Sequence, residues 1–145
     1  MAIVCTLDAS VFVNAFRPHE DGSDASRRLL SAIRSREIPT IEPAILPAEV
    51  AGVWARGTGL VSAAREFAAS LFALPWLQIA PTTAVVARLA ADLAALHRLR
   101  GADAFYVATA QRHGALLVTR DREQLHRAAT AVHVCTPEEA CRRLE

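Results

Sequence analysis

Two short apolar runs, each leading into an aspartate, constrain the fold of this 145-residue chain more than any other feature. The first, residues 3–7, precedes Asp8, and the second, residues 116–119, leads into Asp121. Their length and β-branched residues indicate buried strands. Segments with helical spacing follow both runs and fill most of the chain between them. This alternation predicts βα units around a mostly parallel sheet, with ligands bound at the carboxyl ends of the strands.

The other elements are predicted from apolar spacing and from the positions of proline and glycine. Further strands are expected within residues 39–43, 75–81 and 132–135. Helices are expected over 10–16, 23–36, 46–56, 60–74, 103–112, 123–128 and 137–144, with a long helix that begins at Thr82 or Thr83. Without a repeat or low-complexity linker, residues 1–145 are predicted to form a single domain.

Composition narrows the class of protein. Hydrophobic residues make up 52% of the chain and charged residues 21%, which is typical of a globular domain. No apolar stretch reaches the ~18 residues of a membrane span, and no basic segment precedes the first apolar run as in a signal peptide. No two of the three cysteines are spaced as in a CxxC motif, so they are interpreted as core thiols. We therefore expect a cytoplasmic protein with no membrane contact.

Charge excludes several kinds of chemistry. The formal net charge is +1, so any nucleic acid must be held by local patches rather than by a broad positive field. All basic residues other than histidine are arginines. A chain without lysine has neither a Walker A phosphate loop nor a Schiff-base lysine.

Four acidic residues are candidates for a shared site: Asp8 and Asp121 follow strands, and Glu49 and Asp103 lie where helices begin. Each also has an ordinary structural interpretation, because Asp is a favoured helix cap and acids suit helix amino termini. Gln124 even completes a possible capping box with Asp121. Together, however, clustered carboxylates repel one another and need a cation. All-oxygen ligands favour Mg²⁺ or Mn²⁺, which can activate water for phosphodiester cleavage.

Four segments carry a resemblance to a known family: TLDASVFVNAF, LPAEVAGVWA, LRGADAFYVATAQRHGALLVTRDREQL and VHVCTPEEA. They resemble a PIN domain, particularly the VapC-type toxins of bacterial toxin-antitoxin pairs, over essentially the whole chain. The resemblance implies a three-layer α/β/α sandwich that hydrolyses RNA with Mg²⁺, or alternatively Mn²⁺. By position it implies that Asp8 and Asp103 are the main metal ligands, completed by Asp121 and Glu49.

Supporting residues follow from the same resemblance. Ser10 and Thr119 match hydroxyls that support the carboxylates or contact phosphate, although a local backbone bond is an equal interpretation for Ser10. Glu123 stands where the family often has another Asp or Asn. Arg100, Arg120 and Arg122 adjoin the candidate site, and either contact RNA phosphates or are solvated surface residues. These six chain neighbours of the acids are thus secondary candidates.

The resemblance also implies partners, namely an RNA substrate, a small antitoxin that covers the acidic groove, and a second copy in a homodimer. Apolar residues on the predicted helices can form a groove for a partner helix or belong to the core: Leu29, Leu30, Ile33, Val53, Trp54 and Leu60. One alternative function is a catalytically silent PIN domain that acts in binding or assembly. Another is a phosphatase-like phosphotransfer enzyme, which the missing lysine disfavours.

Overall fold

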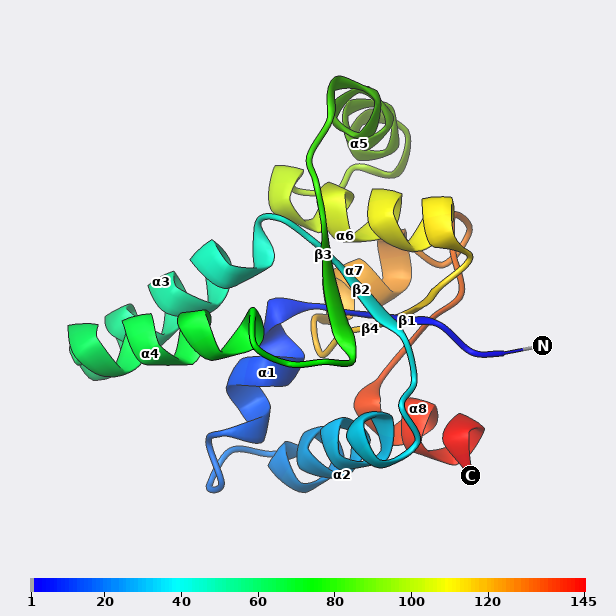
Figure 1. The fold of residues 1–145 in the computed structure, drawn as a ribbon. Coiled ribbons are helices and arrows are strands. Elements are labelled where there is room, and N and C mark those ends of the chain that lie inside the picture. Colours follow the sequence, from blue (N-terminus) through cyan, green and yellow to red (C-terminus); the bar gives the residue numbers. More distant parts are fainter. Residues whose placement is uncertain (1) are drawn as a thin grey trace.

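Five short strands form one parallel sheet at the centre of the molecule (Figure 1). A computed structural model describes residues 2–145. The strands are β1 (Cys5–Leu7), β2 (Thr40–Pro43), β3 (Leu77–Ala80), β4 (Leu116–Val118) and β5 (Val134–Cys135). Their order is β3-β2-β1-β4-β5, and every neighbouring pair is parallel. The predicted α/β class with a parallel central sheet is confirmed.

Helices cover both faces of the sheet, so the predicted three-layer arrangement is also confirmed (Figure 1). In this view α5 and α6 lie above the sheet, α1, α2 and α8 lie below it, and the α3–α4 hairpin projects to the left. None of the helices within residues 2–145 is long and apolar enough to cross a membrane. The helices are α1 (Ala9–Ala15), α2 (Ser23–Ser35), α3 (Leu46–Thr58), α4 (Val61–Leu71), α5 (Ala84–His97), α6 (Gly101–His113), α7 (Arg122–Arg127) and α8 (Pro137–Leu144).

The first strand and the sixth helix begin at different residues from those predicted. β1 begins at Cys5 rather than at residue 3, since Ile3 is 37% exposed. α6 begins at Gly101, where the sequence suggested a break. Because α6 packs against β1, β2 and β4, tertiary contact outweighs the weak helix propensity of glycine there.

Buried thiols and apolar side chains fill the space between the layers. Cys5 on the central strand β1 and Cys135 on the edge strand β5 are buried, and Cys141 is half-buried, as expected for core thiols. Burial raises the pKa of Cys5 to about 12 and that of Cys135 to about 11. All three thiols are free, and the two on the strands remain protonated at neutral pH.

The order of the strands creates a switch point between β1 and β4. From β1 the chain moves outward to β2 and β3, whereas β4 lies on the other side of β1 and leads to β5. In open α/β sheets, ligands bind outside the carboxyl ends of the strands at such a point. Asp8 comes directly after β1, and its N–H donates to Val118 O of β4 at 2.9 Å. Asp121 follows β4, so both aspartates lie at the switch point.

A candidate acidic site at the switch point

Four carboxylates from different parts of the chain line one cavity at the carboxyl end of the sheet. Asp8 lies between β1 and α1, Glu49 on α3, Asp103 on α6, and Asp121 before α7. The cavity has a volume of about 360 Å³. The remaining lining residues are Ala9, Ser10, Val13, Arg17, Glu20, Val53 and Arg100. The structure thus brings together the four acids that the sequence singled out.

Asp8 is the most buried of the four, with 8% of its surface exposed. It is the N-cap of α1, and its Oδ2 accepts the N–H of Ser10 at 3.0 Å. Burial, together with the charges of Glu49 and Asp103, raises the pKa of Asp8 to about 6 against the opposing hydrogen bonds from Ser10. A cation in the cavity would relieve this cost by favouring the charged carboxylate.

Asp121 both caps a helix and faces the cavity. Its Oδ1 accepts the N–H groups of Glu123 at 2.9 Å and of Gln124 at 3.3 Å at the start of α7. The side chain of Gln124 has no hydrogen-bond partner within the described residues, so the reciprocal half of the predicted capping box is missing. For Asp121 the two interpretations offered by the sequence are compatible, because one oxygen serves the cap and the other faces Arg100.

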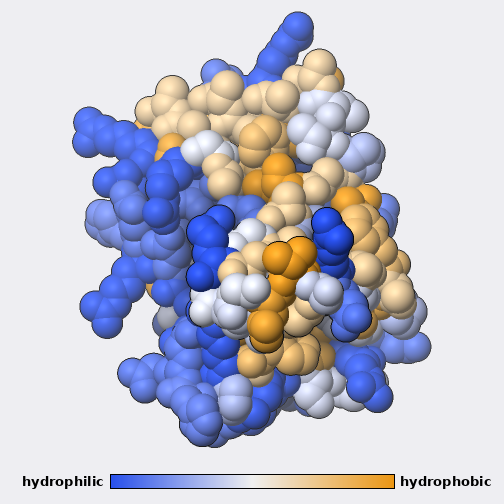
Figure 2. Space-filling model, turned by 90° about the vertical axis from the view of Figure 1, so that its left-hand side faces the viewer, coloured by the Kyte–Doolittle hydropathy of each residue, from blue (hydrophilic) through white to orange (hydrophobic). Residues whose placement is uncertain are grey.

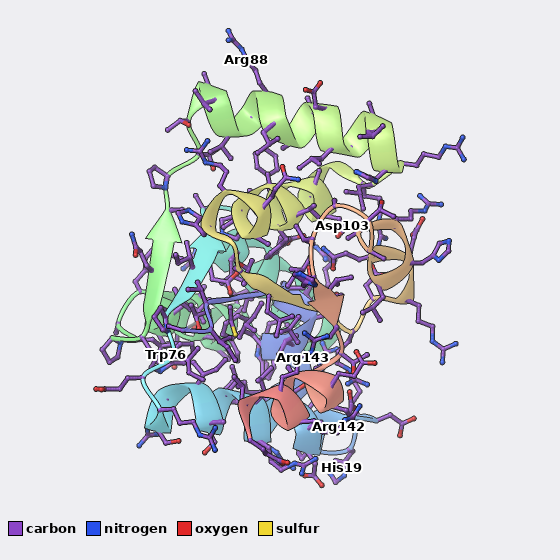
Figure 3. All side chains as sticks on the ribbon, turned by 90° about the vertical axis from the view of Figure 1, so that its right-hand side faces the viewer. His19, Trp76, Arg88, Asp103, Arg142 and Arg143 are labelled. Carbon is purple, nitrogen blue, oxygen red and sulfur yellow. The ribbon has the colours of Figure 1, made fainter. Side chains whose placement is uncertain are left out.

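Asp103 lies in the first turn of α6, three residues after the N-cap Arg100, and makes no cap bond (Figure 3). The capping interpretation therefore does not apply to it. Burial raises the pKa of Asp103, as do Asp121 and Glu123, while Arg100 lowers it. The mutual influence of these acids places Asp103 within one electrostatic cluster.

Arg100 is the cation of this cluster. Its Nε lies 3.2 Å from Oδ2 of Asp103, and its guanidinium also pairs with Asp121 and, at 3.8 Å, with Glu123. These charges, with Asp103 first, raise the pKa of Arg100. The side chain is 62% exposed, so it can leave without disturbing the core.

The supporting residues take structural roles around the carboxylates. Ser10 lines the cavity, and its Oγ accepts the N–H of Arg120 at 3.2 Å, which ties α1 to the turn after β4. Thr119 is fully buried and accepts the N–H of Asp121 at 3.1 Å. The guanidinium of Arg120 pairs with Glu138 at 3.2 Å, away from the cavity. Glu123 contacts Arg100 at the edge, outside the lining residues.

Four residues near the cavity were not predicted from the sequence. Arg17 and Glu20 lie on its wall and pair at 3.5 Å. Glu42 and Tyr106 are both 0% exposed, and the nearby carboxylates influence the hydroxyl of Tyr106. Burial holds the pKa of Glu42 and of Tyr106 well above their usual ranges. The only sequence signal for Glu42 was an acid within a predicted strand.

The donor set fits a hard divalent cation, but its present arrangement does not. Carboxylate oxygens are suitable ligands for Mg²⁺ or Mn²⁺, and Oε1 of Glu49 is buried without a hydrogen-bond partner among the described residues. Within residues 2–145, however, no three His, Cys, Asp or Glu side chains are placed so that they could hold a metal ion together. Two of the four acids are paired with Arg100 instead. An ion that took Asp103 and Asp121 as ligands would have to displace the guanidinium.

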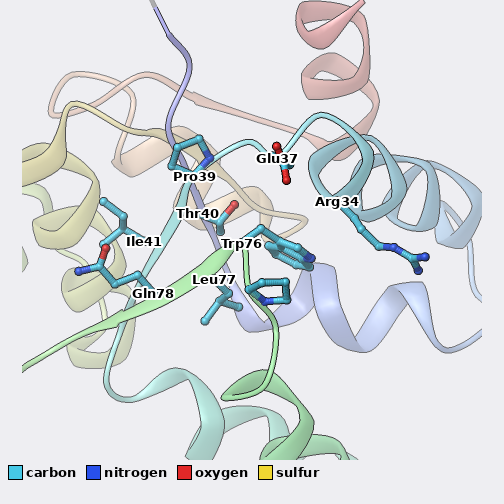
Figure 4. Close-up of a pocket in the computed structure, with 9 residues that line it drawn as sticks. Arg34, Glu37, Pro39, Thr40, Ile41, Trp76, Leu77 and Gln78 are labelled. Carbon is cyan, nitrogen blue, oxygen red and sulfur yellow. The ribbon is translucent and has the colours of Figure 1, made fainter.

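A second cavity lies at the opposite, amino end of β2 and β3 (Figure 4). Its volume is about 310 Å³, and Trp76 lies between Arg34 and Gln78 along its wall. Glu37 is the only acid among the residues that line it. The lining has no group of carboxylates, so the acidic cavity remains the candidate site.

Comparison with known proteins agrees with this geometry. The family model described as "PIN domain" matches residues 5–130. A search of curated proteins found no significant match. Among solved structures, VapBC2 of Rickettsia felis bound to promoter DNA aligns at a TM-score of 0.69 with 16% identity, covering 92% of this chain and 98% of that one.

Two other solved structures are similar over most of their length. A toxin-antitoxin complex from Klebsiella pneumoniae has 24% identity and a TM-score of 0.64, with coverage of 92% of this chain and 97% of that one. VapC20 of Mycobacterium tuberculosis, described as a toxin that cleaves the sarcin-ricin loop, has 16% identity and a TM-score of 0.70. The alignment covers 83% of this chain and 92% of that one. At these identities the likeness establishes the fold.

Proposed function

The chain belongs to the PIN domain family, and from this membership we propose that it is a ribonuclease that hydrolyses RNA phosphodiester bonds with Mg²⁺ or Mn²⁺. The observation that carries the proposal is the acidic cavity, where Asp8, Glu49, Asp103 and Asp121 meet at the switch point of the sheet. Such a group of carboxylates is costly without a cation. A bound divalent cation offsets that cost and attracts a phosphodiester.

Each acid has a proposed role. Asp8 and Asp103 would be the main ligands of the cation, with Asp121 and Glu49 completing its surroundings directly or through water. When bound, such an ion can activate a water molecule and stabilise developing charge on phosphate oxygens. The protein fixes the acids in advance, since Asp8 and Asp121 are held at helix caps.

Arg100 has two roles in this proposal. Without a cation it neutralises Asp103 and Asp121. Once an ion takes its place, the exposed guanidinium is free to contact an RNA phosphate at the edge of the cavity through charge-assisted hydrogen bonds.

Cleavage of RNA by the purified protein tests the proposal directly. With Mn²⁺ or Mg²⁺ the wild type should cleave cellular RNA, and EDTA should stop the reaction. Asp8→Asn and Asp103→Asn should each abolish cleavage, whereas Asp92→Asn on the exposed face of α5 should leave it unchanged. Cleavage that survives Asp8→Asn would exclude this site, because its most buried carboxylate would then be dispensable.

One observation favours a second candidate function, a PIN domain that binds without catalysis. Arg100 pairs with two of the four acids, so half of the carboxylates are already neutralised without a metal ion. Titration calorimetry with Mn²⁺ separates the candidates, because only the nuclease should bind the ion.

We further propose that the protein is the toxin of a toxin-antitoxin pair. Similar structures include VapBC2 and the Klebsiella toxin-antitoxin complex. This chain has an apolar groove of about 370 Å³ between α1, α2 and α4, lined by Phe16, Leu30, Phe67, Leu71 and others. Leu29 and Ile33, by contrast, belong to the core. An apolar helix of the antitoxin fits such a groove.

Co-expression with the protein encoded by a short reading frame directly upstream tests this partner. The two proteins should copurify as a complex, and the complex should not cleave RNA. Leu30→Asp in the groove should weaken the complex, whereas Val85→Asp on the exposed face of α5 should not. If Leu30→Asp left the complex intact, the antitoxin would bind another surface.

A homodimer is the final part of the proposal. Figure 2 shows hydrophobic residues gathered in the middle of the face that carries the α3–α4 hairpin. Leu60 and Val61 at the turn of this hairpin are 59% and 56% exposed. Light scattering should give twice the mass of the 15.6 kDa chain, and Leu60→Asp should reduce it to the monomer mass.

A further inference from the structure

Three buried polar atoms, on residues that line the acidic cavity or adjoin its lining, have no hydrogen-bond partner within the part of the chain that the structure describes. They are Oε2 of Glu42, Oε1 of Glu49 and the hydroxyl of Tyr106. An unpartnered buried polar atom lowers stability, so such atoms are uncommon in native proteins and need an explanation. Their occurrence together under a candidate site suggests a functional one.

Tyr106 connects this group of atoms to the cavity. It lies on α6 three residues after Asp103, which places both side chains on the same side of the helix. The charges of Asp8, Glu49 and Glu42 all act on its phenol. The carboxylate of Glu49 lies close enough to the phenol to influence its pKa as a hydrogen-bond acceptor. In the present conformation, however, the hydroxyl of Tyr106 and Oε1 of Glu49 do not form a hydrogen bond with each other. A small shift of the Glu49 side chain would satisfy both groups.

Glu42 is less suited to be the partner of this hydroxyl. Its Oε1 already accepts the N–H of Leu7 at 2.6 Å, and the residue is fixed within β2. Glu49 is on α3 and lines the cavity, and its Oε1 accepts no hydrogen bond from any of residues 2–145. It is therefore the acid whose orientation is least determined by the rest of the protein.

We propose that Tyr106 is a positioning residue whose hydroxyl donates a hydrogen bond to Glu49 and so orients that carboxylate toward a divalent cation in the cavity. The proposal rests on the proposed function, because it assigns Tyr106 a role in cation binding. A second residue that hydrogen-bonds a metal ligand fixes the orientation in which that ligand meets the ion, and such partners typically change metal affinity about 10-fold or more.

The test compares Tyr106→Phe with the wild type. The change removes only the hydroxyl, so the affinity for Mn²⁺ in titration calorimetry should fall about 10-fold. The melting temperature without metal should stay the same or rise, because a buried group without a partner is lost. Thr109→Val is the matched control: it removes another buried hydroxyl of α6, one that bonds to Phe105 O, and should leave Mn²⁺ affinity unchanged.

A double-mutant cycle tests the route through Glu49. In a Glu49→Gln background, Tyr106→Phe should cause no further loss of Mn²⁺ affinity. The inference is overturned if Tyr106→Phe binds Mn²⁺ like the wild type, or if its effect persists in Glu49→Gln and vanishes in Glu42→Gln. A wild type that binds no Mn²⁺ would instead refute the proposed function, so the two failures are distinguishable.

Discussion

At the scale of single residues, the acidic cavity holds side chains in states that are unfavourable for folding. Asp8 is buried among other acids, and Arg100 bridges three carboxylates at its edge. Active sites often store unfavourable electrostatics of this kind, because the groups are arranged for a ligand rather than for one another. Substitutions here should therefore separate stability from function.

Asp8→Asn should stabilise the metal-free protein at neutral pH. The pKa of Asp8 rises from 3.8 to about 6 on folding, so the folded state keeps a proton that the unfolded state loses. The buried charge of Asp8 therefore lowers the free energy of unfolding. This loss is absent below pH 3.8, grows as the pH rises, and is complete above pH 6, where it reaches at most about 3 kcal/mol. Asn keeps the helix cap.

Urea denaturation in EDTA at pH 7.5 and pH 3.5 measures this effect. The gain in unfolding free energy for Asp8→Asn should be present at pH 7.5 and absent at pH 3.5. Asp24→Asn, an exposed acid on α2, is the control and should not show this dependence. A gain of equal size at both pH values would mean that burial of charge is not its source.

Arg100→Gln should tighten the binding of Mn²⁺ several-fold. The ion would no longer compete with a guanidinium for Asp103 and Asp121. Titration calorimetry at pH 7.5 measures the change, with Arg122→Gln as a neighbouring exposed control. Weaker binding by Arg100→Gln would show that the guanidinium organises the site instead of competing for it.

At the scale of elements, the turn after β4 is held by contacts with distant helices. Arg120 pairs with Glu138 of α8, and its backbone N–H donates to Ser10 of α1. Its guanidinium also lies directly over Gly22, the N-cap of α2, where any Cβ would overlap it. These contacts fix the segment that presents Asp121.

Gly22→Ala should destabilise the protein more than Gly59→Ala. Both glycines have positive φ, 77° and 71°, so alanine at either position costs about 1 kcal/mol in backbone conformation. The methyl group of alanine at position 59 would meet no other atom within 4 Å, whereas at position 22 it would also push Arg120 away from Glu138. The extra cost should be up to about 1 kcal/mol in urea denaturation. Equal losses would mean that Arg120 moves aside freely.

Much of the element order was predictable from the sequence, but the inner part of the site was not. Asp8 and Asp121 could be placed because each follows an apolar strand, and parallel strands end at one edge. Glu42 could not, because its burial depends on the N–H of Leu7, 35 residues away. The start of α6 was missed because packing against three strands, rather than a capping side chain, allows a glycine there.

At the scale of the whole molecule, the balance of charge limits how RNA can be held. A net charge of +1 provides little general attraction for a polyanion. In the proposed nuclease, arginines next to the cavity would therefore supply most of the phosphate contacts. Arg17 on the cavity wall, whose guanidinium carbon lies 6.0 Å from the ring centre of Trp54, is the candidate that we propose for such a contact, whereas Arg88 projects from α5 away from the body (Figure 3).

Arg17→Gln should weaken RNA binding in a salt-dependent manner. Measured with the Asp8→Asn protein to prevent cleavage, the slope of log K against log salt concentration should become shallower by about 0.7. Arg88→Gln should leave the slope unchanged. Identical slopes for the two variants would place the RNA path elsewhere on the surface.

The central position of β1 and β4 implies that the two halves of the acidic cavity differ in mobility. Amide hydrogens of the inner strands of a sheet exchange with solvent only when large parts of a protein open, whereas peripheral elements open locally. Asp8 and Asp121 are attached to the inner pair, but Glu49 belongs to the α3–α4 hairpin at one end of the molecule. Deuterium uptake should therefore be slow beside the two aspartates and faster across the hairpin. Glu49 can move with the hairpin while the aspartate wall stays in place.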